Sequence, residues 1–239
     1  MIPVYNEEHR LPATLESIFS FLNRQEYPSE VLVVENGSQD STYTLACSYA
    51  ERYPGLRIFQ ELQRGKGLAV RRGMFEAVGE YRFMCDVDFS MPLTEINRFF
   101  PPALSGFDIA IASREAPGAK RYNEPFHRHL IGRVFNLLIR SLALPGFHDT
   151  QCGFKCFHAP VVEQLFRRQT VSGWTFDVEI LYIARRRGYR IVEVPVPWYF
   201  NPESKVDVVR DSLQMAIDLL TIRSNTRRGL YTFSDDPQR

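Results

Sequence analysis

Apolar and polar positions follow one another along the chain in two periods, one typical of short strands and one typical of amphipathic helices. Runs rich in β-branched and aromatic residues predict five strands, at residues 1–5, 30–35, 56–61, 81–85 and 107–113. Helical patterns stand between several of them, near residues 8–24, after Asp40 and over 66–78. This order indicates right-handed βαβ units. We therefore expect an α/β domain with a mostly parallel, twisted sheet flanked by helices.

Length and composition fit one large globular domain. The chain has 239 residues, of which 44% are hydrophobic and 24% are charged, and these values are ordinary for a globular protein. We expect a single domain, large enough for a catalytic domain, over residues 1–224 and a flexible tail over residues 225–239. The first apolar run begins at Met1, so the first strand is expected to be cut short.

Charge, hydropathy and cysteine content argue against several protein classes. The net charge of +1 gives no general attraction to nucleic acid, and no nucleic-acid partner is expected. No apolar run reaches the roughly 18 to 20 residues that span a bilayer, and the amino terminus lacks a secretory pattern. The four cysteines predict neither a disulfide framework nor a zinc site, which favours a reduced, cytoplasmic setting.

Polar residues follow four of the predicted strands at the point where each strand ends. They form the segments "PVYNEE" (3–8), "VENGSQDST" (34–42), "DVD" (86–88) and "ASRE" (112–115). In an open parallel sheet, ligands bind beyond the carboxyl ends of the strands. We therefore expect these four segments to converge on one crevice.

Two of these polar residues, Asp86 and Asp88, stand one residue apart at the end of a buried strand. Carboxylates this close do not both stay ionised cheaply without a cation. Mg²⁺ or Mn²⁺ typically takes one or two carboxylates and completes its shell with water and phosphate oxygens. Asp86 and Asp88 are the predicted metal ligands, although the Asp-x-Asp pattern alone also occurs in solvated turns.

Lys66, between two glycines in "ELQRGKGLAV" (61–70), begins a predicted helix. The segment fails the Walker A pattern, because Gln60 and Gly67 stand where that pattern needs Gly and Ser or Thr. It also fails the dinucleotide fingerprint, because Val70 replaces the last Gly. What remains is a cation at a helix amino terminus, where backbone N–H groups and the helix dipole favour an anion.

A set of ordered segments gives a further signal. They are "PVYNEE", "VVENGSQDST", "RGKGLAVRRGM", "CDVDFS", "ASR", "DTQCGFK", "WTFDVEIL" and "VPVPWYFNPESKV". The set resembles inverting family 2 glycosyltransferases with the GT-A fold, a single Rossmann-like domain. More narrowly, it resembles the polyprenyl-phosphate sugar transferases, especially the dolichyl-phosphate β-glucosyltransferases.

The resemblance implies an inverting hexosyltransferase that moves glucose from UDP-glucose to a polyprenyl (dolichyl) phosphate. Two alternatives stay open: a GDP-mannose-dependent mannosyltransferase, and a non-catalytic module that binds a nucleotide sugar. The failed glycine fingerprint disfavours a dehydrogenase.

The resemblance also assigns the donor site. Asp86 and Asp88 are expected to hold Mg²⁺ or Mn²⁺ against the donor diphosphate, with Ser90 nearby. Lys205 is expected to reach the same diphosphate, although by itself it reads as an ordinary exposed lysine. The residues expected to bind the nucleotide sugar are Pro3, Tyr5, Glu7, Glu35, Lys66, Asp86 and Lys205.

On the acceptor side, Arg114 and Arg128 match the positions that bind phosphate in this family. A phosphate oxygen is already a charged nucleophile, so it needs cations to hold it rather than a strong base. Arginine suits this role because its planar fork pairs with phosphate in two places, although Arg128 also reads as a solvated residue. Asp177 and Glu179 fall where many members carry a base. With a phosphate acceptor, Asp177 is assigned to site organisation or sugar contact, and Asp149 to fixing the loop beneath the sugar.

Two predicted helices, over residues 126–144 and 206–222, combine a broad apolar face with arginines. This combination is typical of an interfacial helix on an anionic surface, although such a stripe equally suits plain core. We expect a peripheral contact with the cytoplasmic face of a membrane.

Overall fold

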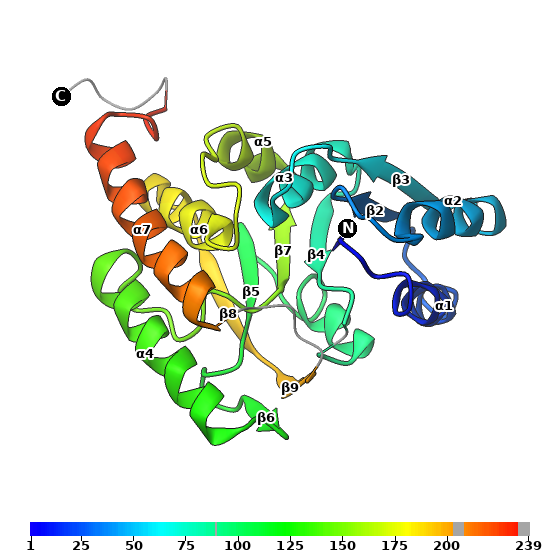
Figure 1. The fold of residues 1–239 in the computed structure, drawn as a ribbon, viewed down its shortest axis with the longest axis horizontal. Helices are drawn as coiled ribbons and strands as arrows, with labels where there is room; N and C mark the ends of the chain where they lie inside the picture. The colour runs from blue at the N-terminus through cyan, green and yellow to red at the C-terminus, as the bar shows by residue number, and fades with distance from the viewer. Residues whose placement is uncertain (89, 203–207, 234–239) are drawn as a thin grey trace.

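Helices lie on both sides of a twisted set of strands in the computed structural model, which describes residues 1–88, 90–202 and 208–233 (Figure 1). The strands are β1 (Ile2–Val4), β2 (Val31–Glu35), β3 (Leu56–Gln60), β4 (Tyr81–Cys85), β5 (Ile109–Ser113), β6 (Lys120–Tyr122), β7 (Phe154–His158), β8 (Ile191–Pro195) and β9 (Pro197–Tyr199). The helices are α1 (Leu11–Leu22), α2 (Thr42–Arg52), α3 (Lys66–Glu76), α4 (Phe126–Leu142), α5 (Ala159–Phe166), α6 (Phe176–Arg187) and α7 (Val208–Arg227), with a 3₁₀ turn at Leu93–Arg98.

Three groups of paired strands form the sheet structure. β1, β2 and β3 pair in parallel, β4, β7, β5 and β8 form a second sheet in that order, and β6 pairs in parallel with β9. The first two groups meet at Met1, whose amino group donates to the Phe83 carbonyl at 2.5 Å and whose carbonyl accepts from the Cys85 N–H at 3.1 Å. The predicted α/β class with mostly parallel pairing is confirmed.

One strand departs from the parallel pattern. β7 lies between β4 and β5 and runs antiparallel to both. No strand was predicted there, because Lys155 interrupts the apolar run "FKCFH". Lys155 is nevertheless almost fully buried, and its charge is compensated within the fold, as described below.

The core consists of two apolar clusters on opposite faces of the second sheet. In β5, Ile109 and Ile111 belong to one cluster and Ala110 and Ala112 to the other. Successive side chains of a strand point to opposite faces, so a strand covered on both faces reads as a continuous apolar run. The polar groups of this sheet therefore collect where its strands end.

The carboxyl-terminal segment is packed further than the sequence analysis expected. α7 continues to Arg227, beyond the predicted domain boundary at residue 224. Tyr231 and Phe233 are buried, and the Tyr231 hydroxyl donates to Oε1 of Glu179 at 2.6 Å. Residues 225–233 thus belong to the packed domain, which corrects the boundary; residues 234–239 lie outside the described residues.

Within the residues that the structure describes, no helix is both long enough and apolar enough to cross a bilayer.

Candidate active site

A cavity of about 270 Å³ lies at the carboxyl ends of β4 and β5. Several elements contribute to its lining: the start of α3, the segments after β4 and β5, α4, the start of α6 and the segment around β9. The predicted site residues that line it are Lys66, Asp86, Asp88, Ser90, Arg114, Arg128, Asp149 and Asp177. The fold thus brings together residues that the sequence analysis assigned to metal, donor and acceptor.

Asp86 and Asp88 form the carboxylate pair of this cavity. Burial and the neighbouring Asp86 raise the pKa of Asp88, while the Ser90 N–H, which donates to its Oδ1 at 3.2 Å, opposes the shift. The carboxylate of Asp86 lies directly against the backbone of Gly153, where a Cβ would stand only 1.9 Å from Oδ2. A side chain at position 153 would displace the Asp86 carboxylate. Two carboxylates this close repel each other, and a cation between them reduces that repulsion.

Lys66 lies beside this pair. Its Nζ is 2.6 Å from Oδ1 of Asp86 and 4.8 Å from the centre of the Trp174 ring. Burial disfavours its charge, but the carboxylates of Asp86, Asp177 and Asp88 raise its pKa above the ordinary value. Lys66 is therefore a fixed positive charge in the cavity.

The position of Lys66 depends on the loop before α3. The Asn36 side chain accepts from the Gly65 N–H at 2.7 Å and donates to the Gln63 carbonyl at 2.6 Å. Gly65 has a φ of +154°, and a Cβ there would meet the Ser172 carbonyl oxygen at 2.4 Å. Asn36, which the sequence analysis treated as a simple turn residue, thus fixes the start of α3.

The donor set suits a hard divalent cation that shares its shell with a ligand. Among the described residues, no group of three or more His, Cys, Asp or Glu side chains forms a complete metal cage. Mg²⁺ needs only one or two carboxylates where phosphate and water supply the other oxygens. Asp86 and Asp88, with the raised pKa of Asp88, fit this kind of site.

Arg114 is held by Asp149 in a bidentate pair. Its Nε donates to Oδ2 at 2.6 Å and its Nη2 to Oδ1 at 3.0 Å. Burial disfavours both charges, but the attraction between the two groups outweighs the cost of burial. The pKa of Arg114 is therefore raised, and that of Asp149 lies well below its usual range. The planar fork that the sequence analysis assigned to phosphate is thus engaged by Asp149, and phosphate binding by Arg114 stays a prediction.

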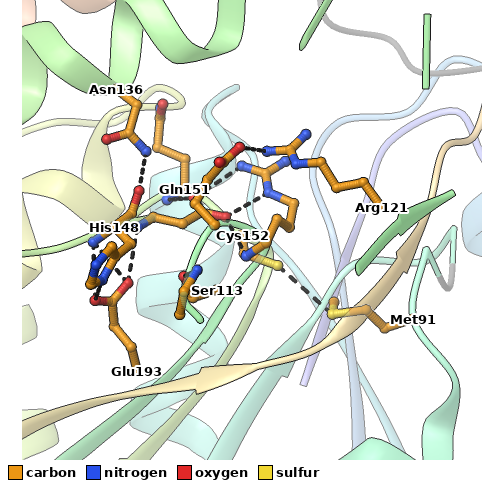
Figure 2. A network of polar contacts seen from close by, with 12 residues as sticks. Met91, Ser113, Arg121, Asn136, His148, Gln151, Cys152 and Glu193 are labelled. Carbon is orange, nitrogen blue, oxygen red and sulfur yellow. Dashed lines mark hydrogen bonds and ion pairs between the residues drawn. The ribbon is translucent and has the colours of Figure 1, made fainter. Parts of the chain in front are cut away.

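Asp149 is fixed in turn by a hydrogen-bond network that includes His148, Glu193 and Asn136 (Figure 2). Glu193 of β8 accepts from the backbone N–H of Asp149 at 2.9 Å and from His148, whose Nδ1 lies 2.9 Å from Oε2. The Asn136 side chain of α4 donates to the His148 carbonyl. The loop at 148–151 is therefore held between β8 and α4, which sets the position of Arg114.

Sequence reasoning missed a second ionic cluster in the cavity. Nη2 of Arg121 lies 2.7 Å from Oε1 of Glu115, and its Nη1 lies 2.6 Å from Oε2 of Glu124. Trp198 lies against this cluster from β9. The "GAKRY" segment around Arg121 matches no motif, but Trp198 stood within the resemblance segment "VPVPWYFNPESKV", and that aromatic residue was the available signal.

Asp177 is buried at the start of α6, where Oδ2 lies 3.1 Å from Nζ of Lys155 and Oδ1 accepts from the Val178 N–H at 2.8 Å. Burial raises its pKa, although Lys155 and Lys66 oppose the shift. Both oxygens are thus engaged within the protein. This arrangement is consistent with a role in organising the site, which stays a prediction.

Glu179, two residues further along α6, is fully buried and has a structural role. Its carboxylate accepts from the backbone N–H groups of Thr170 and Val171 and from the hydroxyl of Tyr231. It therefore fixes a loop and the carboxyl-terminal segment, and it does not line the cavity.

The expectation of one crevice for four strand ends is met by two of them and stays a prediction for the other two. The segments after β4 and β5 line the cavity, whereas those after β1 and β2 bind each other: the Asn6 N–H donates to the Ser38 hydroxyl at 3.0 Å. Oε2 of Glu35 accepts from Gln60 at 3.2 Å. The predicted donor residues outside the cavity lining are Pro3, Tyr5, Glu7 and Glu35. Lys205 lies outside the described residues.

Comparison with known proteins places the sequence among glycosyltransferases. Residues 1–166 match the family model "Glycosyl transferase family 2". The dolichyl-phosphate beta-glucosyltransferase of Dictyostelium discoideum is 33% identical over 97% of this chain and 75% of its own length. The human enzyme of that name is 33% identical over 97% of this chain and 76% of its own length.

Solved structures support the fold. Glucosyl-3-phosphoglycerate synthase from Mycobacterium tuberculosis, crystallised with phosphoglyceric acid, has a TM-score of 0.69 and 17% identity over 92% of this chain and 78% of that one. Its complex with Mn²⁺, UDP-glucose and phosphoglyceric acid has the same TM-score and identity, over 95% of this chain and 78% of that one. Together with the sequence matches, these likenesses show that the chain belongs to glycosyl transferase family 2 and has the GT-A fold.

Proposed function

We propose that this chain is an inverting, metal-dependent hexosyltransferase that moves glucose from UDP-glucose to a polyprenyl phosphate of the dolichyl type. One observation carries the proposal: Asp86 and Asp88, suited to a cation, and Arg114 and Arg128, suited to a phosphate, line the same cavity. Relatives named dolichyl-phosphate beta-glucosyltransferase support glucose as the sugar and a lipid phosphate as the acceptor.

On the donor side, Asp86 and Asp88 hold Mg²⁺ or Mn²⁺, and Lys66 adds a positive charge beside them. The cation, when bound, neutralises the charge that develops on the departing nucleoside diphosphate. A structural neighbour crystallised with Mn²⁺ and UDP-glucose supports a donor of this kind. We assign the nucleoside to the ends of β1 and β2, which carry Pro3, Tyr5, Glu7 and Glu35, and we keep Lys205 as a residue for the diphosphate.

On the acceptor side, the lipid phosphate attacks the anomeric carbon through an oxygen that is already ionised near neutral pH. Arg114 and Arg128 orient that phosphate, and no general base is required. The engagement of both Asp177 oxygens within the protein supports a mechanism without such a base. A single in-line displacement inverts the α-linked donor, so the product is β-linked.

The surface beside the cavity supports a lipid acceptor. Ile131 and Phe135 of α4 line the cavity, and further large apolar side chains of this helix face solvent, among them Phe126 with 79% of its surface exposed. α7 packs beside α4 (Figure 1). It also exposes apolar side chains. The exposed apolar residues, here called the α4–α7 face, are Phe126, Leu130, Ile131, Val134, Leu137, Leu213, Ile217 and Leu220.

Exposed apolar residues that gather on two neighbouring helices differ from the single ones found on most protein surfaces, and they suit contact with a lipid surface. Arg133 and Arg140 of α4 are exposed and suit the anionic headgroups of a cytoplasmic leaflet. We therefore place the protein at the cytoplasmic face of a membrane as a peripheral protein.

The test is a transfer assay with purified protein and Mn²⁺. UDP-glucose, UDP-galactose, GDP-mannose and UDP-N-acetylglucosamine are each offered with mixed polyprenyl phosphates, and the anomer of the product is determined by NMR. We expect transfer from UDP-glucose and a β linkage. Preference for GDP-mannose would replace the sugar and keep the mechanism, whereas an α-linked product would overturn the mechanism.

A further inference from the structure

We propose that Arg121 is a third phosphate-binding residue of the acceptor site, and that Trp198 is the positioning residue that holds Arg114 and Arg121 together. The inference rests on the proposed lipid-phosphate acceptor. It starts from the short β6–β9 ribbon, whose first strand, β6, belongs to no motif of the sequence analysis.

The ribbon places Arg121 directly opposite Trp198, because the two residues are register partners in the parallel β6–β9 pair. The next pair, Tyr122 and Tyr199, is stacked with ring centres 4.6 Å apart, which stiffens the ribbon. Arg121 and Trp198 both line the cavity that also contains Asp88. The ribbon therefore acts as a wall of the candidate active site.

One indole ring holds two guanidinium groups. Cζ of Arg114 lies 5.5 Å and Cζ of Arg121 lies 5.4 Å from the centre of the Trp198 ring. Both distances fall within the range of a cation–π contact. Two residues further along, Phe200 holds Arg128 in the same way, at 5.0 Å. Trp198 and Phe200, two residues apart, thus hold three arginines that line the same cavity.

The acceptor phosphate offers more acceptor atoms than Arg114 and Arg128 alone would engage. A phosphomonoester carries about −1.5 to −2 charges near neutral pH, whereas Arg114 already forms a bidentate pair with Asp149. Arg121 is the second guanidinium on the same ring, and it brings further N–H donors to the cavity although Glu115 and Glu124 pair with its charge. Arginine carries five N–H donors in a fixed plane, so it retains donors for a phosphate while its two terminal nitrogens pair with carboxylates.

The carboxylates around Arg121 set its orientation. Glu115 and Glu124 each pair with one terminal nitrogen, and Nδ1 of His129 lies 3.0 Å from the same oxygen of Glu124. Nε of Arg121 is buried and has no hydrogen-bond partner among the described residues. A buried donor without an acceptor is uncommon, and an anion entering the cavity supplies acceptors to this guanidinium.

The experiment measures binding of farnesyl phosphate, a short soluble polyprenyl phosphate, to the full chain. The chain has two tryptophans, so a Trp174→Phe background leaves Trp198 as the fluorescent reporter. In that background we expect Arg121→Gln to raise the dissociation constant about tenfold or more, as loss of a charged hydrogen bond implies. The dissociation constant of Arg121→Lys should lie between those of the background protein and of Arg121→Gln. Arg24 is an exposed arginine beyond α1, and Arg24→Gln should have no effect.

Kinetics separate a binding role from a structural one. With UDP-glucose as donor, Arg121→Gln and Trp198→Leu should raise the KM for farnesyl phosphate and leave the KM for UDP-glucose unchanged. Thermal melting establishes that each variant is folded. If Arg121→Gln does not fold, Arg121→Lys and Trp198→Leu carry the test, because the first keeps the charge and the second keeps the ion pairs.

The outcomes distinguish this inference from the proposed function. Unchanged farnesyl phosphate affinity and KM in folded Arg121 variants would overturn the inference while glucose transfer stands. Binding that depends on Arg121 in a protein that transfers no sugar would support the phosphate site and sink the proposed function.

Discussion

The ammonium nitrogen of Lys155 lies 3.1 Å from Oδ2 of Asp177, and both side chains are almost completely removed from solvent. Lys155 also donates to the Cys152 carbonyl at 2.6 Å. The pair joins β7, the antiparallel strand, to the start of α6 and so fixes one wall of the cavity. Each charge is tolerated in the interior because the other is present.

Removing one member of this pair should therefore cost more than removing both. We expect Lys155→Met to lower the free energy of unfolding by about 3 to 5 kcal/mol, because it leaves the Asp177 carboxylate buried without its hydrogen-bonded cation. The double variant Lys155→Met, Asp177→Leu should recover most of that loss. Urea denaturation of the two single variants and the double variant measures the coupling; strictly additive effects would contradict it.

Substituting Asp88 should separate metal-dependent binding from folding. Burial and Asp86 raise the pKa of Asp88, so its ionised form opposes folding at neutral pH and Asp88→Asn should not lower the metal-free melting temperature. UDP with Mn²⁺ should raise the melting temperature of the wild type, since a ligand of the folded state stabilises it, and should not raise that of Asp88→Asn. Glu51→Gln, an exposed substitution on α2, serves as the control, and a retained Mn²⁺-dependent shift in Asp88→Asn would remove the metal assignment.

The Arg114–Asp149 pair should make stability depend on acid pH. Arg114 holds the folded pKa of Asp149 well below the unfolded value of about 3.9. Asp149 therefore contributes stability that is present above about pH 4 and is lost as the pH falls toward its folded pKa. Asp149→Asn should cost about 3 to 5 kcal/mol at pH 7.

The difference between wild type and Asp149→Asn should then shrink on acidification below about pH 4. Chemical denaturation at a series of pH values measures both proteins. A difference that stays constant down to the acid limit would show that Asp149 contributes by its shape rather than by its charge.

The α4–α7 face should control membrane binding without affecting the fold. Leu130 and Val134 are exposed, so the pair of substitutions Leu130→Glu and Val134→Glu should leave the melting temperature within about 2 °C of the wild type. The same variant should bind anionic phospholipid vesicles several-fold less in flotation. Leu62→Glu and Val78→Glu, at exposed apolar residues elsewhere, are the matched controls. An equal loss of vesicle binding in the controls would show that the added negative charge, rather than the α4–α7 face, governs binding.

Much of the fold could be predicted because strands and helices leave local patterns. The run 107–113 is apolar on both faces, and the structure buries β5 between two core clusters. β7 escaped prediction because its buried Lys155 depends on Asp177, a partner 22 residues away. A charge within an apolar run favours solvent until that partner is known.

For the candidate site, the sequence by itself determined the α/β class, an Asp-x-Asp pair at a strand end, and arginines of the kind that bind phosphate. Only the tertiary structure decided which of them meet: Asp86 with Lys66, Arg114 with Asp149 and Arg121 with Trp198. The reason is physical. Periodicity along the chain records which side chains are buried, whereas the pairing of charges across 35 residues, as between Arg114 and Asp149, follows from strand order and register.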